Sequence, residues 1–497
     1  MPGMTSPDLR PILTVPHPVL REKALPVSFN EPELAVEVAA LHAALNDFRE
    51  RMGFGRAIAA PQIGILKRLI ALNLGAGPVT IINPEIFWRS DEQFEVWDDC
   101  LSIPDVVVRV KRHTSISLTY QDEQGRKREW INLPPDLSEL LQHEIDHLDG
   151  ILMTDRAHGP DALQPMARHA ELVGEGRPRH RLSLENIRQS AGVIDPVFLN
   201  SPQFNCEPLS AALGCELTLK LEFTNPIRSF KGRGASYLIR QLTAQGDHRL
   251  VVCGSAGNFG QAMAYACRAA ERDIVIFASV NANPLKVERM RLLGAEVRQA
   301  GEDFDAAKEA AQAFAHQTGA LMIEDGRQEA VSEGHGTIGL ELLKQAGLYD
   351  AITIPLGNGA LLNGVGRWFK AASPATRVVG VSASGASAMR ESWQTGQLVQ
   401  PQSVNTIADG IAVRVPIPEA VADMQGSVDS VLLVDDSHLI QAMQLLYRHG
   451  GLLVEPSGAA GVAALLAYPE QFQGKKVATL LCGSNLTETQ IREWILN

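Results

Sequence analysis

Apolar positions repeat with different periods along the chain, and the N-terminal region mixes helix and strand patterns. Over residues 31–51, apolar residues recur every three or four positions, which predicts an amphipathic helix. A second helix is predicted over residues 137–149, between a Pro134-Pro135 turn and Gly150. Strands followed by one helix indicate a small α+β domain, which we assign to residues 1–165. The apolar runs that predict these strands are Leu69–Leu72, Val79–Phe87, Val106–Val110 and Ser115–Tyr120.

From residue 182 onward, almost wholly apolar runs alternate with helical patterns. Such alternation predicts a parallel sheet covered by helices on both faces, an α/β domain over residues 182–497. The runs are Leu250–Cys253, Ile274–Ala278, Ala351–Pro355, Val378–Val381, Val431–Val434 and Val477–Leu481. The helical patterns include Gln261–Ala270, Phe304–Thr318 and Ser437–Tyr447. Residues 166–181 have little apolar period and contain the basic run Arg177-Pro178-Arg179, so we interpret them as a solvated linker.

Composition narrows the class of protein. A chain of 497 residues exceeds what one hydrophobic core usually supports, which agrees with two domains. The formal net charge of −12 disfavours nucleic acid and anionic membranes as partners. No apolar run is long enough to span a bilayer, and no secretory signal is evident. Because six cysteines in this length make no disulfide framework, we expect a cytoplasmic protein.

The predicted helix over 137–149 carries a metal-binding pattern. His143 and His147 are four residues apart, so their side chains project from one face and can share a metal ion. Glu144, beside them, can act on water bound to that ion. A metal with three protein ligands keeps a position open for water, and Cys100 would supply a thiolate as the third ligand. The alternative is a chance pattern of two surface histidines and a buried cysteine.

Three motifs that follow one another in the first region resemble those of peptide deformylases. They are Gly55–Gly64, Cys100-Leu101-Ser102 and Gln142–Gly150, and the resemblance covers about residues 8–165. It implies a ferrous iron or zinc ion held by Cys100, His143 and His147, with Glu144 as general base and acid. The implied reaction is metal-assisted hydrolysis of a formamide.

The same resemblance assigns an oxyanion hole and reveals two departures from the family pattern. Gln62 and the backbone N–H of Leu101 would stabilise the developing negative charge on the formyl oxygen. Ala57 replaces the usual glycine, and Asp98-Asp99 replaces the usual Glu-Gly before the cysteine. A charged Asp99 could reshape the pocket, so the substrate need not be an ordinary formyl-methionyl peptide.

A second set of motifs lies in the C-terminal region. Taken alone, Lys231 between Phe230 and two glycines would be read as a surface lysine in a glycine turn. With Glu222 and Asn225-Pro226, however, it resembles the lysine motif of serine/threonine dehydratases, which are pyridoxal-phosphate enzymes of the tryptophan-synthase-β fold (fold type II). The resemblance covers about residues 182–497. Further motifs follow in the family's order: Ser255–Gln261, Gly357–Leu361, Thr406–Val413, Glu455–Ala460 and Cys482–Asn485.

These motifs imply a binding site for pyridoxal 5′-phosphate. Lys231 would bond to the cofactor beside Phe230, and Asn258 would hydrogen-bond the 3′-oxygen of the ring. A loop that follows a strand and opens a helix would cradle the phosphate with backbone N–H groups. This loop consists of Gly357, Asn358, Gly359, Ala360 and Leu361. A dinucleotide-binding turn is the alternative, but the third glycine and an acidic ribose partner are missing.

Four positions refine the reaction. Cys482 would face the pyridine nitrogen as a neutral thiol, which favours β-elimination over extensive carbanion chemistry. Ala256 stands where related racemases commonly place a serine base, which favours a dehydratase. Ser382 stands where many relatives carry a metal-binding glutamate, so no cation is expected in this domain. Cys253 and the nearby Cys267 are interpreted as core residues.

The leading hypothesis is a bifunctional enzyme whose substrate is a small amino acid, either free or N-formylated. Deformylation would free an amine, and the second domain would then eliminate a β-substituent from a serine- or threonine-like product. Two alternatives stay open: independent activities with β-replacement in the second domain, or a deformylase-like domain that has lost catalysis and serves in binding or assembly. A homodimer is expected by analogy.

Overall fold

A computed structural model describes residues 9–168, 171–172, 180–346 and 348–496. Part of the expected linker, including Arg177-Pro178-Arg179, lies outside the described residues. A first compact unit comprises the chain up to His180 together with Ala371–Ala375, and a second comprises Arg181–Lys370 and Thr376–Asn497. None of the described helices is long and apolar enough to cross a membrane.

The described part of the first unit contains two antiparallel sheets and the α-helices α1 and α2. Helix α1 spans Leu34–Met52, and α2 spans Pro135–Leu148. A five-stranded sheet has the order β1-β2-β3-β6-β7, and a three-stranded sheet the order β4-β5-β8. The strands are β1 Ala57–Ala59, β2 Leu69–Asn73, β3 Pro78–Arg89, β4 Gln93–Cys100, β5 Ile103–His113, β6 Ile116–Gln121, β7 Lys127–Trp130 and β8 Leu163–Pro165.

The predicted elements of this unit occur in the structure, and β1, β4, β7 and β8 are additions. The longest of these additions is β4. Its sequence contains Glu95, Asp98 and Asp99, so it lacks the apolar run that predicts a strand. It forms because β5 pairs with it antiparallel over nearly its whole length, from Gln93 opposite His113 to Cys100 opposite Ile103. This hairpin carries Cys100 beside helix α2, whose residues from Leu137 to Leu148 are all buried.

The second unit is an α/β structure with two sheets. A six-stranded sheet has the order β17-β16-β15-β18-β10-β9, and a four-stranded parallel sheet the order β13-β12-β11-β14. In the larger sheet only the edge strand β9 runs antiparallel to its neighbour. The strands are β9 Gln203–Asn205, β10 Glu216–Leu221, β11 Val251–Gly254, β12 Ile274–Ala278, β13 Glu296–Gln299, β14 Leu321–Ile323, β15 Ala351–Pro355, β16 Arg377–Ala383, β17 Ser430–Val434 and β18 Lys476–Leu481.

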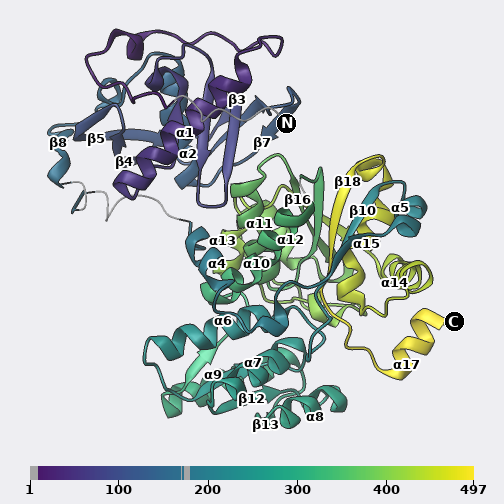
Figure 1. The fold of residues 1–497 in the computed structure, drawn as a ribbon. Helices are drawn as coiled ribbons and strands as arrows, with labels where there is room; N and C mark the ends of the chain where they lie inside the picture. The colour runs from purple at the N-terminus through teal and green to yellow at the C-terminus, as the bar shows by residue number, and fades with distance from the viewer. Residues whose placement is uncertain (1–8, 169–170, 173–179, 347, 497) are drawn as a thin grey trace. The chain divides into compact units, whose positions relative to one another are not determined.

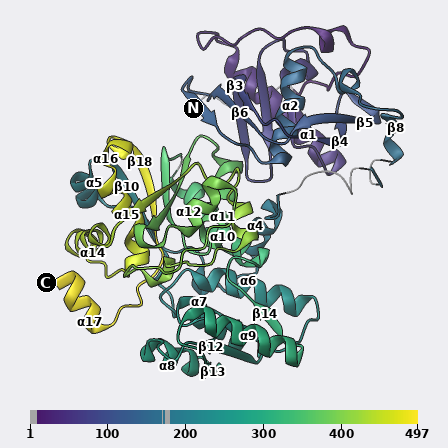
Figure 2. The same cartoon turned by 180° about the vertical axis from the view of Figure 1, so that it is seen from behind.

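Helices cover both sheets. Figures 1 and 2 show β12 and β13 with α7, α8 and α9 in one lobe of this unit, and β10, β16 and β18 in the other. The helices are α4 Leu184–Ser190, α5 Glu207–Leu213, α6 Lys231–Ala244, α7 Asn258–Ala269, α8 Pro284–Leu292, α9 Phe304–Thr318, α10 Glu329–Ala346, α11 Ala360–Ala372, α12 Ala388–Thr395, α13 Pro418–Asp423, α14 Asp436–Gly450, α15 Pro456–Ala467, α16 Pro469–Phe472 and α17 Glu488–Ile491.

The alternating pattern predicted one parallel sheet, and the structure divides the strands between two. The apolar runs mark strands but carry no information about their partners: β10 pairs with β18, so that Glu216 lies opposite Lys476. Strands β11–β14 pair only with one another and form the smaller sheet. Cys253 and Cys267 are fully buried in its core, as the sequence predicts.

Three helices of the second unit begin where a preceding strand ends. Helix α6 begins at Lys231 after β10, α7 begins at Asn258 after β11, and α11 begins at Ala360 after β15. Helix N-termini and the carboxyl ends of parallel strands are the usual place for anionic ligands in α/β folds. The first residues of these three helices, Lys231, Asn258 and Ala360, line one cavity.

Candidate active sites

Three buried side chains converge in the first unit. The possible ligand atoms of Cys100, His143 and His147 all lie within 4.8 Å of one another. His147 Nε2 is 3.2 Å from Cys100 Sγ and 3.2 Å from His143 Nε2. The two rings come from successive turns of α2, and the thiol comes from the end of β4. This is the group of residues that the sequence predicts as metal ligands.

The donor atoms fit a divalent iron or zinc ion. A thiolate and two imidazole nitrogens are the ligands that such ions take in catalytic sites with three protein ligands. His143 directs its Nδ1 to the Asp98 carboxylate at 3.0 Å, which leaves Nε2 facing Cys100 and His147. A carboxylate behind a histidine fixes the ring's tautomer and orientation in many metal sites.

Asp98 and Arg112 are functional candidates that the motifs did not identify. Arg112 is buried and donates to Asp98 at 2.9 Å and to Asp146 at 2.6 Å. Although burial opposes ionisation, His143 and Arg112 hold the pKa of the Asp98 carboxyl well below its usual range. The signal available in the sequence was a carboxylate two positions before Cys100.

Glu144 and Gln62 lie at the same cluster. Glu144 follows His143 on α2 and is 4% exposed, and its Oε2 has no hydrogen-bond partner among the described residues. Burial raises the pKa of its carboxyl to about 7, near the value at which one group can accept and return a proton. The amide nitrogen of Gln62 lies 3.8 Å from Cys100 Sγ and 3.2 Å from Ser102 Oγ, and its Oε1 accepts from the N–H of Ala59 at 2.8 Å.

The two departures from the family pattern lie near this cluster. Ala57 is buried at the start of β1, opposite Leu72. Asp99 is half-buried between Asp98 and Cys100 in β4. Leu101 follows in a turn, next to the cysteine.

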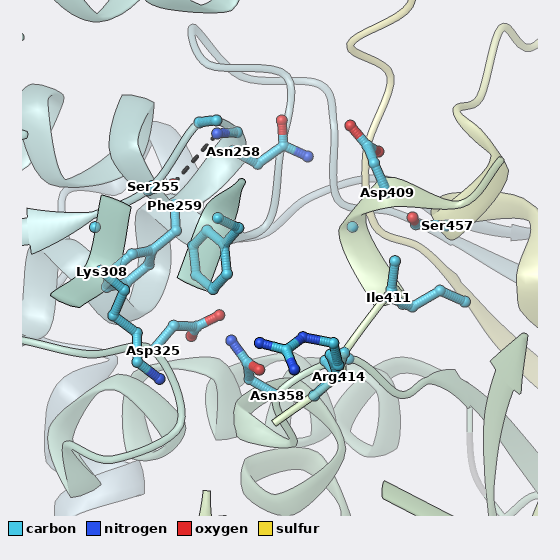
Figure 3. Close-up of a pocket in the computed structure, with 18 of the residues that line it drawn as sticks. Ser255, Asn258, Phe259, Lys308, Asp325, Asn358, Asp409, Ile411, Arg414 and Ser457 are labelled. Atoms are coloured by element: carbon cyan, nitrogen blue, oxygen red, sulfur yellow. Dashed lines mark hydrogen bonds between the residues drawn. The ribbon is translucent and has the colours of Figure 1, made fainter. Parts of the chain in front are cut away.

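A cavity of about 810 Å³ in the second unit collects the other predicted residues (Figure 3). It is lined by residues from six separate motifs, and every residue that the sequence assigned to the cofactor lies in this lining. These residues are Phe230, Lys231, Asn258, Gly357, Asn358, Gly359, Ala360, Leu361 and Cys482.

Lys231 lies at the N-terminus of α6 with its ammonium group in two contacts. Its Nζ donates to Asp325 Oδ2 at 2.5 Å and lies 4.6 Å from the centre of the Phe230 ring. The backbone N–H of Phe230 donates to the carbonyl of Cys482 at 3.1 Å, which ties the lysine to the end of β18. Burial raises the pKa of the Cys482 thiol far above its usual value, so this group is neutral.

The Asn258 amide is held by two residues to which the sequence assigned no role. Its Nδ2 donates to Glu455 Oε1 at 2.7 Å, and its Oδ1 accepts from Asn485 Nδ2 at 2.8 Å. Both partners belong to motifs that the sequence singled out. A side chain on Gly483 would collide with the Glu455 carboxylate, since an added Cβ would lie 2.1 Å from Oε1.

The glycine loop between β15 and α11 has the geometry of a phosphate cradle. Gly359 adopts a φ of +93°, which a side chain would strain. An added Cβ on Gly357 would lie 2.8 Å from the carbonyl oxygen of Gly410. The loop leads into the N-terminus of a 13-residue helix, where backbone N–H groups favour an anion. The lysine, the glycine loop and the neutral Cys482 thiol together fit pyridoxal 5′-phosphate.

Two further residues that the sequence singled out lie in the cavity wall and in the sheet core, respectively. Ala256 lines the cavity. Ser382 is buried in β16, and its hydroxyl donates to the carbonyl of Leu356 at 3.2 Å.

Comparisons with known proteins match both domains. The pyridoxal-phosphate dependent enzyme model matches residues 194–483, and the polypeptide deformylase model matches residues 9–162. A biosynthetic L-threonine dehydratase of Lactococcus lactis is 30% identical over 319 residues, which are 63% of this chain and 77% of that protein.

Solved structures give the same result for the second domain. The processed form of threonine deaminase isoform 2 from Solanum lycopersicum has a TM-score of 0.58 at 30% identity and covers 62% of this chain and 87% of its own. Maize serine racemase has a TM-score of 0.59 at 28% identity, over 63% of this chain and 96% of its own.

Both resemblances, and the two-domain fold class that they implied, are confirmed. The chain belongs to the pyridoxal-phosphate dependent enzymes through a threonine dehydratase-like second domain, and it carries a polypeptide deformylase domain as its first.

Proposed function

We propose that the chain is a bifunctional enzyme that hydrolyses an N-formyl group and eliminates a β-substituent from an amino acid. The observation that carries the proposal is the convergence of both predicted residue sets. Cys100, His143 and His147 meet around one point, and all nine predicted cofactor residues line one cavity. The first domain is taken as residues 1–165 and the second as residues 182–497.

In the first domain, Cys100, His143 and His147 would hold the metal ion. A divalent iron or zinc ion there would polarise the formyl carbonyl and make water a better nucleophile. The Glu144 carboxylate takes a proton from the attacking water and returns it to the departing amine. The Gln62 amide and the N–H of Leu101 donate hydrogen bonds to the formyl oxygen as negative charge develops on it. Asp98 keeps the His143 ring in the orientation that its Nδ1 contact defines.

In the second domain, Lys231 and Asn258 would hold the ring of pyridoxal 5′-phosphate, and the loop 357–361 its phosphate. The cofactor supplies an electron sink for the bond broken at the α carbon. Lys231 Nζ accepts the α proton, and the β-substituent leaves with its electron pair. The neutral Cys482 thiol limits how far negative charge is delocalised, which favours elimination over longer-lived carbanions. Ala256 offers no second base, so a racemase is disfavoured.

The chemical reason to join the two sites is that the first makes the group that the second needs. The nitrogen lone pair of a formamide is delocalised into its carbonyl and cannot condense with an aldehyde. Deformylation frees the α-amine, and only the free amino acid can react at Lys231.

Incubation of the full chain with N-formyl-serine and N-formyl-threonine tests this proposal. Formate and a 2-oxo acid are measured separately, with iron or zinc and pyridoxal 5′-phosphate supplied. We expect wild type to release both, Glu144→Gln to release neither from the formyl substrate, and Lys231→Ala to release formate alone. Free serine bypasses the first site and should give oxo acid with Glu144→Gln.

The alternative functions give different results. Formate and oxo acid that arise only from unrelated substrates would indicate independent activities, and incorporation of an added nucleophile would indicate β-replacement. No formate from any formyl compound, despite a bound stoichiometric metal, would indicate a first domain that serves in binding or assembly. Each of these results rejects the proposal that deformylation supplies the substrate of the elimination.

A further inference from the structure

The cavity of the second domain carries more acidic than basic side chains, and its cations are paired. Among the residues that line it, four are cationic and six are acidic. Each cation has a carboxylate partner: Lys231 with Asp325, Lys286 with Asp409, Lys308 with Glu324 and Arg414 with Asp305. An acidic side chain on a substrate would therefore have to break an existing ion pair to gain a partner.

Asp325 differs from the other acids because its cationic partner is the reactive lysine. It follows β14 by two residues and is 9% exposed. Its Oδ2 accepts from Lys231 Nζ at 2.5 Å, whereas its Oδ1 is buried with no hydrogen-bond partner among the described residues. In Figure 3 its carboxylate points into the cavity, on the side where Asn358 and Arg414 lie.

The proposed reaction changes the charge next to this carboxylate. To accept the α proton, Lys231 Nζ would have to be a neutral amine, and it would then offer no ammonium charge to Asp325. A buried carboxylate without a cation or enough donors is costly, so a donor brought by the substrate would be strongly favoured. Because Lys231 acts on the α carbon, a carboxylate 2.5 Å from Nζ is within reach of substituents on the adjacent β carbon.

We propose that Asp325 recognises a protonated amino group on the β carbon, so that the preferred substrate of the second site is a 2,3-diamino acid. This inference rests on the proposed elimination and names its substrate class. A charge-assisted hydrogen bond to a carboxylate is about twice as strong as a neutral one, so an ammonium group is favoured over the hydroxyl of serine or threonine.

The reaction balances with this substrate. Lys231 takes the α proton, the electron pair of that C–H bond forms the Cα–Cβ double bond, and the Cβ–N bond breaks. The β-ammonium group leaves as neutral ammonia with the electron pair of the broken bond, while Asp325 stays ionised throughout. Addition of water to the released enamine then gives a 2-oxo acid and a second ammonia.

The test compares 2,3-diaminopropionate, serine, threonine and aspartate on the full chain loaded with pyridoxal 5′-phosphate. Oxo acid formation gives kcat/KM. The initial change in cofactor absorbance gives dissociation constants for 2,3-diaminopropionate and for its uncharged isostere 2-aminobutyrate. Asp325→Asn removes the charge at the proposed contact. Asp305→Asn is the matched control, because it removes a carboxylate from the same cavity that pairs with Arg414 instead.

Wild type should bind 2,3-diaminopropionate about tenfold or more tightly than 2-aminobutyrate and use it in preference to serine. Asp325→Asn should lower kcat/KM for the diamino acid about 10- to 100-fold and that for serine by no more than about threefold. Asp305→Asn should leave two ratios as in wild type: the ratio of the two dissociation constants, and the ratio of kcat/KM for the diamino acid to kcat/KM for serine.

A preference of wild type for serine, threonine or aspartate overturns the proposal. So does an equal loss for all substrates in Asp325→Asn, which would mean that Asp325 acts only through Lys231. If no amino acid gives oxo acid but the Asp325-dependent binding preference persists, the elimination fails and the recognition stands. If that binding preference is absent too, both the proposed elimination and the proposed recognition by Asp325 are wrong.

Discussion

Asp98 lies behind the predicted metal ligands, and replacing it tests whether the first site is built to hold an ion. A single oxygen, Oδ2, contacts His143 Nδ1 at 3.0 Å and Arg112 Nη2 at 2.9 Å. Asp98→Asn keeps an acceptor of the same shape but removes the charge. Asp98→Ala removes the acceptor as well and leaves the His143 Nδ1 without its partner, whereas Arg112 keeps Asp146 at 2.6 Å.

The expected effects are graded. Loss of a carboxylate behind a ligating histidine typically weakens metal binding about 10- to 100-fold. We expect Asp98→Asn near the lower end, about 1.4 kcal/mol, and Asp98→Ala near the upper end, about 2.7 kcal/mol. The Ala variant should also unfold more easily, because a buried guanidinium loses one of its two carboxylate partners.

Zinc affinity is measured by competition with a chromogenic chelator at fixed pH, and the metal content of each purified chain is measured directly. Glu95→Gln is the control, since Glu95 lies on the same strand with about half of its side chain exposed. Its carboxylate lies 3.5 Å from His158 Nε2 rather than beside the predicted ligands. If Asp98→Ala binds zinc within about twofold of wild type, the orienting role derived from these contacts is refuted.

Three further predictions concern the second domain. Arg233 is fully buried and donates to Glu222 and Glu341 at 2.7 to 2.9 Å. Arg233→Ala should therefore lower the free energy of unfolding, measured in urea, by about 3–5 kcal/mol. A loss below about 1 kcal/mol would contradict the stabilising role of these ion pairs. Although burial opposes ionisation, Arg233 holds the pKa of Glu341 below its usual value. The ionised Glu341 carboxylate therefore contributes fully to stability above the pKa of about 4.3 that it has in the unfolded chain. This contribution is lost as pH falls through the lower pKa of the folded protein. Glu341→Gln should flatten the dependence of unfolding free energy on pH below about pH 4, and an unchanged slope would reject this assignment. Lys231→Ala should abolish the absorbance of the lysine-bound cofactor while the first domain still binds zinc; loss of zinc binding as well would show that the domains do not act separately.

The sequence predicted helices and strands correctly where their formation depends on residues close together in the chain. Apolar residues at a period of 3.6 or 2 require only neighbouring positions, so α1, α2, α9 and the central strands β12 and β15 follow from it. Strand β4 was not predicted, because its acidic residues hide the pattern and its pairing with β5 supplies the stabilisation. The sequence pattern also did not predict the division into two sheets, because pairings such as β10 with β18 join residues about 260 positions apart.

The sequence by itself also predicted the residues of both candidate sites. His143 and His147 could be named because they stand at helical spacing, and Cys100 because it is the one cysteine in residues 1–165. Lys231 could be named because its neighbours form a specific motif. Only the tertiary structure placed Asp98 behind His143, Glu455 against Asn258 and Asp325 beside Lys231. Asp325 is 94 positions from Lys231, and such contacts arise from the packing of whole elements rather than from local spacing. The proposed reaction class therefore rests on local sequence motifs, whereas the residues that surround the proposed reactive groups depend on the fold.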